Sequence, residues 1–421
     1  MRSRKAGPFA LPLLLLALSV LINYIDRGNL SIAAPLLKEE FAISASQLGI
    51  LFSAFFWTYT ILLFACGCFI DRFDINRVLA SGYLVWSIAT AATGMVQGFA
   101  MLLVMRLLLG MGESVAFPCY SKILAQHLPE HRRGFANGAI VAAMKCGPVV
   151  GTLGAGLLMT KYGWRPVFIG IGLLSLAWLP AWIKVMPRAV APVHSVVCPK
   201  VIDILRQRSF WATVAGGFSL AYPLYFMVTW LPFYLTHEQH LSMSDMVNTA
   251  ALYYGVDAAA ALTTGWITDF WICRGFDASI VRKSAMAVGW AIAAVGFLGC
   301  SSAGPKSFLT WLIITGIGCG IGNSGIWAFS QTLAGPHAAG RWVGLQNGFA
   351  NLAGVIGPAL TGFIVDWTGH FQAALVITAG VCLLSGISWV FLVGRLEPVS
   401  WTTNTDPLMA APTAIPQVHY P

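Results

Sequence analysis

"NGAIVAAMKCGP" at residues 137–148 and "NGFANLAGVIGP" at residues 347–358 are two versions of one segment, and their recurrence reveals how this chain is built. Both place an Asn-Gly pair ten residues before a Gly-Pro pair. The preceding segments agree as well, because "LPEHRRGFANG" leads into the first copy and "AGPHAAGRWVGLQNG" into the second. The chain therefore consists of two related halves.

A second pair of related segments lies earlier in each half. "GCFIDRFDINR" at 67–77 corresponds to "GWITDFWICRG" at 265–275. Together the repeats predict the following division: a first six-helix half over 1–190, a basic cytoplasmic loop over 191–207, a second six-helix half over 208–396, and a disordered Pro/Thr-rich tail over 397–421.

The composition indicates a membrane protein. Apolar residues make up 57% of the chain and charged residues 10%, with a mean hydropathy of +0.74, whereas a soluble domain carries about 25% charged residues. A spanning helix needs about 20 apolar residues. On this basis we predict an all-α membrane protein with twelve transmembrane helices, at 8–34, 47–70, 78–97, 99–127, 136–159, 165–186, 210–235, 247–271, 282–302, 306–333, 341–364 and 371–394.

The net charge of +9 raises the possibility of a nucleic-acid partner, but the placement of the basic residues argues against it. If both termini are cytoplasmic, most Lys and Arg lie in cytoplasmic segments or at cytoplasmic helix ends, as the positive-inside rule requires. The predicted outer segments hold only Lys38, Lys161, Arg165 and Lys306. We therefore expect a multi-pass protein of a bacterial inner membrane, with both termini cytoplasmic, membrane lipid as its surroundings and no nucleic acid as a partner.

Metal, cofactor and enzyme sites are not predicted. The nine cysteines have no zinc-binding spacing and are interpreted as small apolar residues. The glycine-rich stretch "GIGCGIGNSG" at 316–325 follows no predicted strand, so it does not match a dinucleotide-binding loop. No histidine lies well inside a predicted span, where it could activate a serine nucleophile.

Few ionisable residues lie well inside the predicted spans, and each costs roughly 2.5–3.5 kcal/mol to insert. Arg106 and Glu113 are two helical turns apart, so they share one face at a separation of about 10 Å. Asp26 and Arg27 are neighbours, so their side chains diverge by about 100°. These residues predict a charged interior between the first and fourth helices; the alternative is a salt-bridge network that only stabilises the bundle.

The two-half architecture resembles the major facilitator superfamily, in which the substrate site lies near mid-membrane between the halves. The loop residues Gly67, Asp71, Arg72 and Arg77 match its signature, while Asp74 stands where a glycine is usual. Four further motifs resemble the anion:cation symporter family, and most closely its galactonate-type proton symporters: "NYIDR…LSIA" from 23, "FSAFFWTYT" from 52, "RLLLGMGE" from 106 and "TWLPFYL" from 229.

The resemblance implies a role for each matching residue. Arg27 would bind the substrate carboxylate, with Tyr24 and Tyr59 lining the site. Asp26 and Glu113 would carry protons. The remaining implied roles are these: Arg106 tunes Glu113 by alternating between partners, and in the second half "GNSGIW" and "LQNG" bring Ser324, Trp327 and Asn347 to the substrate.

The residue types suit these roles independently of the resemblance. An Arg side chain grips a carboxylate with two hydrogen bonds and keeps its charge. A carboxyl group has its pKa raised by burial and lowered by a nearby cation, so it can load and release a proton as its surroundings change.

Lys145 departs from the sugar-acid carriers, which have uncharged side chains in the middle of the fifth helix. Its counterpart in the second half is Val355, so the charge belongs to one half only. Lys145 either adds a second anion contact, or snorkels, or pairs with Asp257 or Glu113.

The sequence thus predicts a monomeric, proton-coupled symporter that imports a small organic anion. A sugar acid such as an aldonate or uronate comes first, and a dicarboxylate or aromatic acid next. A uniporter or exchanger of the same anions is the main alternative, and a transport-inactive anion sensor is a further one.

Overall fold

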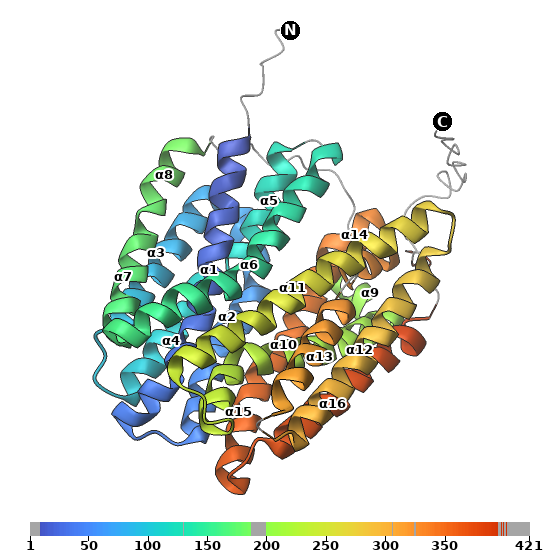
Figure 1. The fold of residues 1–421 in the computed structure, drawn as a ribbon. Helices are drawn as coiled ribbons and strands as arrows, with labels where there is room; N and C mark the ends of the chain where they lie inside the picture. The colour runs from blue at the N-terminus through green and yellow to red at the C-terminus, as the bar shows by residue number, and fades with distance from the viewer. Residues whose placement is uncertain are drawn as a thin grey trace, which may run out of the picture.

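The computed structural model describes residues 9–128, 130–186, 199–304, 306–323 and 326–394, together with 397, 399 and 401. The described part is helical throughout (Figure 1). Its elements are α1 (Ala10–Phe41), α2 (Ala45–Arg72), α3 (Ile75–Thr93), α4 (Phe99–Glu113), α5 (Ala116–His127), α6 (Glu130–Tyr162), α7 (Trp164–Leu176), α8 (Trp178–Val185), α9 (Val201–Leu205), α10 (Arg208–His237), α11 (Met243–Cys273), α12 (Ala278–Ser302), α13 (Phe308–Gly322), α14 (Ile326–Ala350), α15 (Leu352–Thr368), α16 (Gln372–Ile387) and the π-helical turn η1 (Ser388–Leu392).

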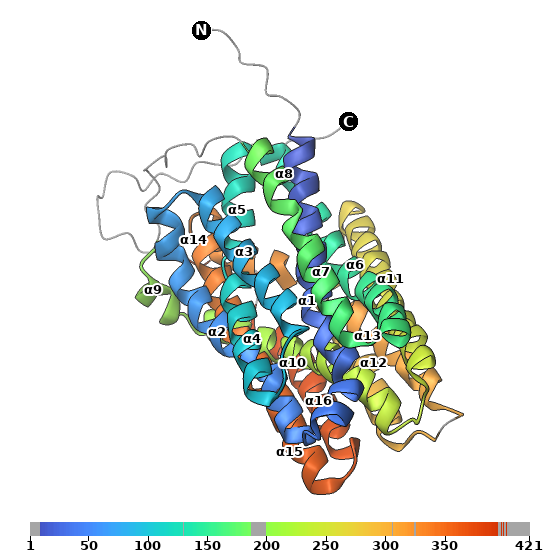
Figure 2. The same cartoon turned by 90° about the vertical axis from the view of Figure 1, so that its left-hand side faces the viewer.

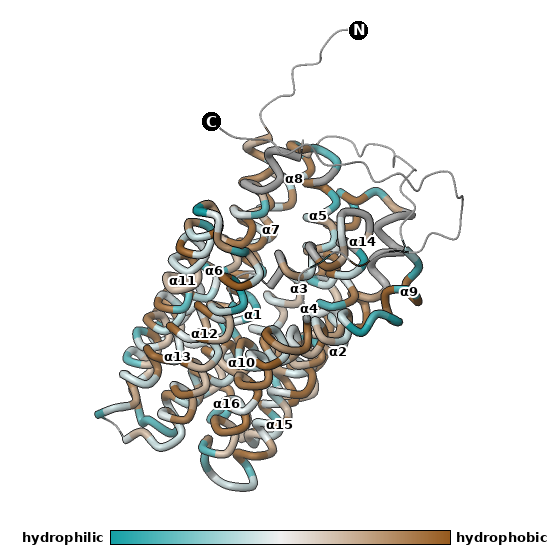
Figure 3. Tube along the Cα trace, turned by 90° about the vertical axis from the view of Figure 1, so that its right-hand side faces the viewer, coloured by the Kyte–Doolittle hydropathy of each residue, from teal (hydrophilic) through white to brown (hydrophobic). Residues whose placement is uncertain are grey.

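Within the described residues, every predicted span lies mostly on helix. Within the described ranges, nine segments are long and apolar enough to cross a membrane, and the other predicted spans fall on α3, α11 and α13. Figure 3 shows hydrophobic residues along the helices and hydrophilic residues at several of the loops that join them. The prediction of an all-helical membrane fold is thus confirmed.

Several predicted spans are divided or lengthened in the structure. The fourth consists of α4 and α5, and the sixth of α7 and α8, which follow one another along the same side of the molecule (Figure 2). The helix α14 bends sharply at Gly335 (φ 68°, ψ 171°), where the predicted tenth and eleventh spans meet. Only a residue without a side chain adopts such a backbone at low cost. The first span continues past Pro35 to Phe41.

Asp74, which departs from the superfamily signature, has a local role. It is the N-cap of α3, and its side chain accepts hydrogen bonds from the backbone N–H groups of Asn76 and Arg77. Asp277 caps α12 in the same way, by accepting from Ile280 at 2.9 Å. Each cap satisfies backbone donors that a helix start leaves free. The side chains of Asp71 and Arg72, which also match the signature, lie outside the described part.

In the described part of the chain, four helix pairs join the first half to the second: α2 with α15, α6 with α11, α1 with α10, and α2 with α14. We call the end of the molecule at which α1 begins the upper end and the opposite end the lower end, as in Figure 1. The helix α11 is slanted relative to α1, so their upper ends lie apart in this view.

The halves are in tight contact at the lower end. The carboxylate of Asp366 on α15 accepts hydrogen bonds from the backbone N–H groups of Ala45 (2.9 Å) and Ser46 (2.7 Å) at the start of α2. A Cβ at Gly362 would lie 2.4 Å from the Ala45 carbonyl oxygen, so a side chain there would clash. Small residues therefore let α2 and α15 approach closely, as in other membrane helix pairs.

Candidate functional site

Arg27 on α1 lies at the centre of the charged interior. Its Nε donates to Oε2 of Glu113 on α4 at 2.8 Å, and the two side chains are 8% and 0% exposed. The rings of Tyr24, Phe55 and Tyr59 surround the guanidinium, with centroids 5.1, 4.9 and 4.7 Å from its carbon. Cation–π contacts of this kind stabilise a desolvated cation by about 2 kcal/mol or more. The site therefore holds Arg27 in its charged form away from bulk water.

Arg27 keeps hydrogen-bonding capacity in this arrangement. Among the described residues, the Nη2 atom of Arg27 has no hydrogen-bond acceptor. The Oε1 atom of Glu113 likewise has no hydrogen-bond donor. A guanidinium presents five N–H donors in a planar fork. Arg27 can therefore donate hydrogen bonds to a second carboxylate, or release Glu113 and bind another carboxylate in its place.

Asp26 and Arg106 complete the charged group. Asp26 is 1% exposed and forms no ion pair with the described residues. The charges of Glu113 and Arg106 lie close enough to act on it. Arg106 is 5% exposed, lies 5.3 Å from the centroid of the Phe55 ring, and has no acceptor at its Nε among the described residues. In this conformation Glu113 pairs with Arg27 and not with Arg106.

The second half contributes a polar network that the sequence analysis missed. Tyr225 on α10 packs against Phe56 on α2, with ring centroids 4.3 Å apart. Its hydroxyl donates to Oδ1 of Asn351 at 2.6 Å, and Nδ2 of Asn351 donates to the backbone oxygen of Asn347 at 2.7 Å. Phe56 in turn packs against Phe55, one of the rings around Arg27, with centroids 4.9 Å apart, so this network lies beside the Arg27 group.

Two signals in the sequence could have identified these residues. Tyr225 lies one turn before the "TWLPFYL" motif, on the same helix. Asn351 follows Asn347 by four residues and so shares its helix face. The carboxamide of Asn351 lies inside an apolar span, where it requires a hydrogen-bond partner, and this requirement marks it as a candidate site residue.

The structure describes the side chains of only some of the remaining predicted site residues. Asn347 is half-buried in α14, and Tyr59 is 2% exposed beside Arg27. Ser324 lies outside the described residues. Trp327 belongs to α14, but its side chain also lies outside the described part.

Lys145 on α6 donates to Oδ2 of Asp257 on α11 at 2.8 Å. Of the possibilities that the sequence left open, the structure contains the pair with Asp257. This ion pair joins helices from opposite halves of the chain.

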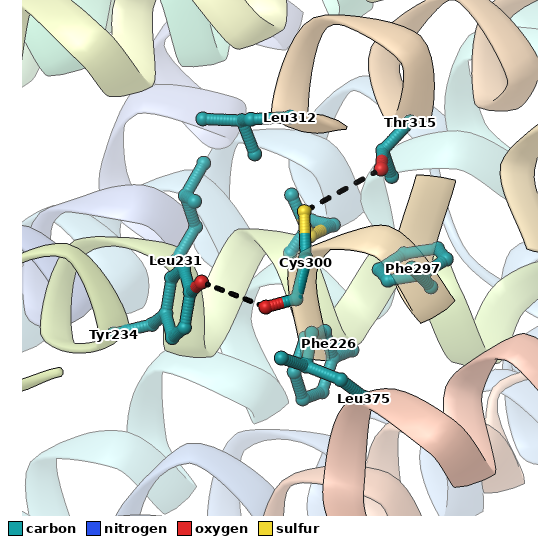
Figure 4. Close-up of a pocket in the computed structure, with 9 residues that line it drawn as sticks. Phe226, Leu231, Tyr234, Phe297, Cys300, Leu312, Thr315 and Leu375 are labelled. Atoms are coloured by element: carbon teal, nitrogen blue, oxygen red, sulfur yellow. Dashed lines mark hydrogen bonds between the residues drawn. The ribbon is translucent and has the colours of Figure 1, made fainter. Parts of the chain in front are cut away.

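A small apolar cavity lies within the second half, away from these charges. It is lined by residues of α10, α12, α13 and α16, among them Phe226, Phe297 and Leu375 (Figure 4). The Tyr234 hydroxyl donates to the Cys300 carbonyl oxygen beside it at 3.4 Å. The volume of the cavity, about 10 Å³, is roughly the space that one water molecule needs. It is a packing defect of the core and not a substrate site.

No group of three or more His, Cys, Asp or Glu side chains among the described residues is placed to hold a metal ion.

Comparison with known proteins adds family information to this geometry. The family model described as "Major Facilitator Superfamily" matches residues 16–276 and 249–416. The hexuronate transporter of Bacillus subtilis is 28% identical over 402 residues, which cover 90% of this chain and 94% of that protein. The D-galactonate transporter of Escherichia coli is 26% identical, over 92% of this chain and 96% of that protein.

Solved structures share the fold. The crystal structure of a D-xylose-proton symporter superposes with a TM-score of 0.78 at 14% identity, covering 93% of this chain and 99% of that one. A bacterial homolog of the human lysosomal transporter Spinster, in an inward-facing and occupied conformation, gives a TM-score of 0.71 at 18% identity, covering 92% of this chain and 96% of that one. At these identities the likeness concerns the fold alone.

Proposed function

Because this chain belongs to the major facilitator superfamily of membrane transporters, we propose that it is a proton-coupled symporter that imports a small organic anion by alternating access. The favoured substrates are sugar acids, aldonates or uronates, ahead of dicarboxylates and aromatic acids. The relatives named for hexuronate and galactonate support this class, since both compounds are sugar acids. The four motifs that resemble the anion:cation symporter family also support this proposal.

The observation that carries the proposal is the buried Arg27–Glu113 pair among three aromatic rings. The substrate carboxylate takes the place of Glu113 on Arg27. The planar fork then holds the substrate with two charge-assisted hydrogen bonds, and Tyr24 and Tyr59 line the site.

Protonation of Glu113 makes this exchange possible. A neutral carboxylic acid no longer competes with the substrate anion for Arg27, because the ionic attraction is lost. One proton therefore accompanies one substrate carboxylate. Asp26 is the second proton carrier, and Arg106 stabilises whichever of the two carboxylates is ionised while the other is protonated.

The second half closes over the substrate with uncharged groups. Asn347, with Ser324 and Trp327 by resemblance, contacts the hydroxyl groups of the sugar chain. Tyr225 and Asn351 extend this polar surface, because their hydrogen bonds link α10 to the α14–α15 region. Opening and closing occurs by movement of the half at 1–190 against the half at 208–396.

We place the protein in a bacterial inner membrane as a monomer with cytoplasmic termini. The alternative is a uniporter or exchanger of the same anions, in which Glu113 and Arg27 form a pair that responds to substrate without proton transfer. A transport-inactive sensor would bind the anion and not move it.

Uptake by proteoliposomes decides between these functions. Labelled D-galactonate and D-galacturonate are supplied outside, with and without an inward proton gradient. Symport predicts accumulation above the external concentration only with the gradient. Equal uptake with and without the gradient would indicate uniport, uptake only against preloaded anion would indicate exchange, and binding without uptake would indicate a sensor.

A further inference from the structure

The ion pair between Lys145 and Asp257 is separate from the Arg27 group and has no part in the mechanism above. It joins α6 to α11, and therefore one half of the transporter to the other. Two charges at this interface indicate a function, because charges inside a membrane are costly and small residues alone can hold membrane helices together. At the α2–α15 interface, glycine contacts and the exposed carboxylate of Asp366 do this without an ion pair among the described residues.

The pair lies where the α6–α11 contact begins to open. Toward the lower end, Thr152 is 3% exposed, and a Cβ at Gly156 would lie 2.5 Å from Val247 of α11. Toward the upper end, Val141 is 43% exposed, one turn from Lys145 on the same face. Among the described residues, no atom of another helix lies within 4 Å of the place where a Cβ at Gly138 would be. The charges thus mark the boundary between a closed and an open part of the interface.

The pair is also less enclosed than the Arg27–Glu113 pair. The Lys145 and Asp257 side chains are 19% and 12% exposed, against 8% and 0% for Arg27 and Glu113. Asp257 is the one described acceptor for the three donors of Lys145. Oδ1 of Asp257 has no donor among the described residues. Both partners can therefore take a further ligand.

The helix α6 links the pair to the proposed carboxylate site. Gly147, two residues from Lys145, faces α1, and a Cβ there would lie 2.4 Å from Cβ of Tyr24. Gly151 packs against Ile25 in the same way. One side of α6 thus contacts the helix that carries Arg27, while Lys145 faces α11 close by.

We propose that Lys145 recognises a second carboxylate of the substrate, and that Asp257 occupies this position when no dianion is bound. The substrate class is then a sugar diacid, with one carboxylate on Arg27 and the other on Lys145. This inference rests on the proposed organic-anion transport and specifies its substrate class. Asp257 is a specificity residue because it competes with the substrate for Lys145.

Exchange of one carboxylate for another explains why Lys145 has an internal partner. Leaving one member of a buried pair without a counter-charge destabilises a protein strongly, whereas the pair itself contributes little. A diacid keeps Lys145 paired while the α6–α11 contact opens and Asp257 turns toward water. A monoacid leaves the Lys145–Asp257 pair in place and binds through Arg27 alone.

The test compares two probes that differ in one end group, D-galactonate as the monoacid and galactarate as the corresponding diacid. Binding of each is measured by calorimetry on purified wild type, Lys145→Met, Asp257→Asn and the double variant. Removing Lys145 should weaken galactarate about tenfold or more, equivalent to about 1.4 kcal/mol, and change galactonate less than about twofold.

Asp257→Asn separates the proposal from a structural role. Without its internal competitor, Lys145 should bind galactarate several-fold more tightly than in wild type. The double variant should regain the thermal stability of wild type, because neither charge is left unpaired, and yet show no preference for galactarate.

Equal loss of both probes in Lys145→Met would overturn the proposal, as would a galactarate preference in the double variant. Failure of wild type to bind galactarate or any other diacid of a panel of aldarates would overturn it as well. Binding of galactonate that depends on Arg27 would show in that case that the proposed anion site stands and that only the second-carboxylate inference has failed.

Discussion

The two halves of the molecule repeat one fold and carry different chemistry. In the first half, Asp26, Arg27, Arg106 and Glu113 are ionisable and buried. In the second half, the groups that face them are the neutral Tyr225, Asn351 and Asn347. A duplicated architecture therefore does not require duplicated chemistry: one half holds a cluster of ionisable side chains, while the other places neutral hydrogen-bonding groups beside it.

This division has a physical advantage. Each buried charge needs a counter-charge at every stage of a transport cycle, because an isolated ion is costly in an apolar interior. Grouping Asp26, Arg27, Arg106 and Glu113 within one half lets these four residues exchange partners without waiting for the other half. Neutral hydrogen-bonding groups lose less when the halves separate, since water can replace their partners.

The largest effect is expected from Arg27→Lys. Lysine keeps the charge but presents a point-like ammonium in place of the planar fork. We expect anion binding to fall by roughly 100-fold or more, in the range typical of a truncated buried charge pair. Arg165→Lys is the matched control, because Arg165 forms an ion pair with Glu40 that is 34% and 40% exposed. Calorimetric binding by Arg27→Lys similar to wild type would make Arg27 a structural residue.

The second effect concerns Glu113→Gln. Glutamine keeps the shape of a protonated glutamic acid and cannot release a proton. The variant should bind the anion and exchange it across the membrane at all pH values tested, without accumulating it against a gradient. Counterflow and uphill uptake in proteoliposomes measure the two properties separately. Uphill accumulation at the wild-type rate would remove Glu113 from the coupling path.

A smaller effect is expected from Tyr225→Phe in the second half. The change removes the 2.6 Å hydrogen bond to Asn351 and keeps the packing against Phe56. A hydrogen bond of this kind contributes about 0.5–1.5 kcal/mol, so anion affinity should fall between about twofold and tenfold. Tyr234→Phe is the control, since it removes a hydroxyl that bonds Cys300 and Gln239 away from the site. Equal losses in both variants would point to reduced stability as the cause.

The smallest effect is expected from Asp366→Ala at the lower end. It removes two hydrogen bonds to the start of α2 without touching either charged group. Because the carboxylate is exposed, the closed lower end should lose no more than about 1–2 kcal/mol. Distances between spin labels on α2 and α15 should lengthen in a larger fraction of molecules, with unchanged anion selectivity. A change in selectivity would instead link Asp366 to the site.

The helices and their order follow from the sequence, because the apolar runs are long enough to span a membrane and little else can satisfy their backbone. Helix ends were predicted less well. The fourth span divides after Glu113 and the first continues past Pro35 to Phe41, since caps and packing decide such ends. Tyr225 and Asn351 escaped prediction because single polar residues in an apolar run do not show which neighbour they bond.

The sequence by itself determined which charges lie in the membrane, because an Asp, Glu, Lys or Arg inside an apolar span can be seen in the printed chain. Only the tertiary structure decided how they pair. Arg27 and Glu113 are separated by 86 positions and Lys145 and Asp257 by 112, and equally plausible partners, Arg106 and Glu113 among them, lay closer in sequence. A side chain pairs with the carboxylate that helix packing brings within about 3 Å, and helix packing depends on small contact residues such as Gly147 and Gly151 whose positions carry no charge signal.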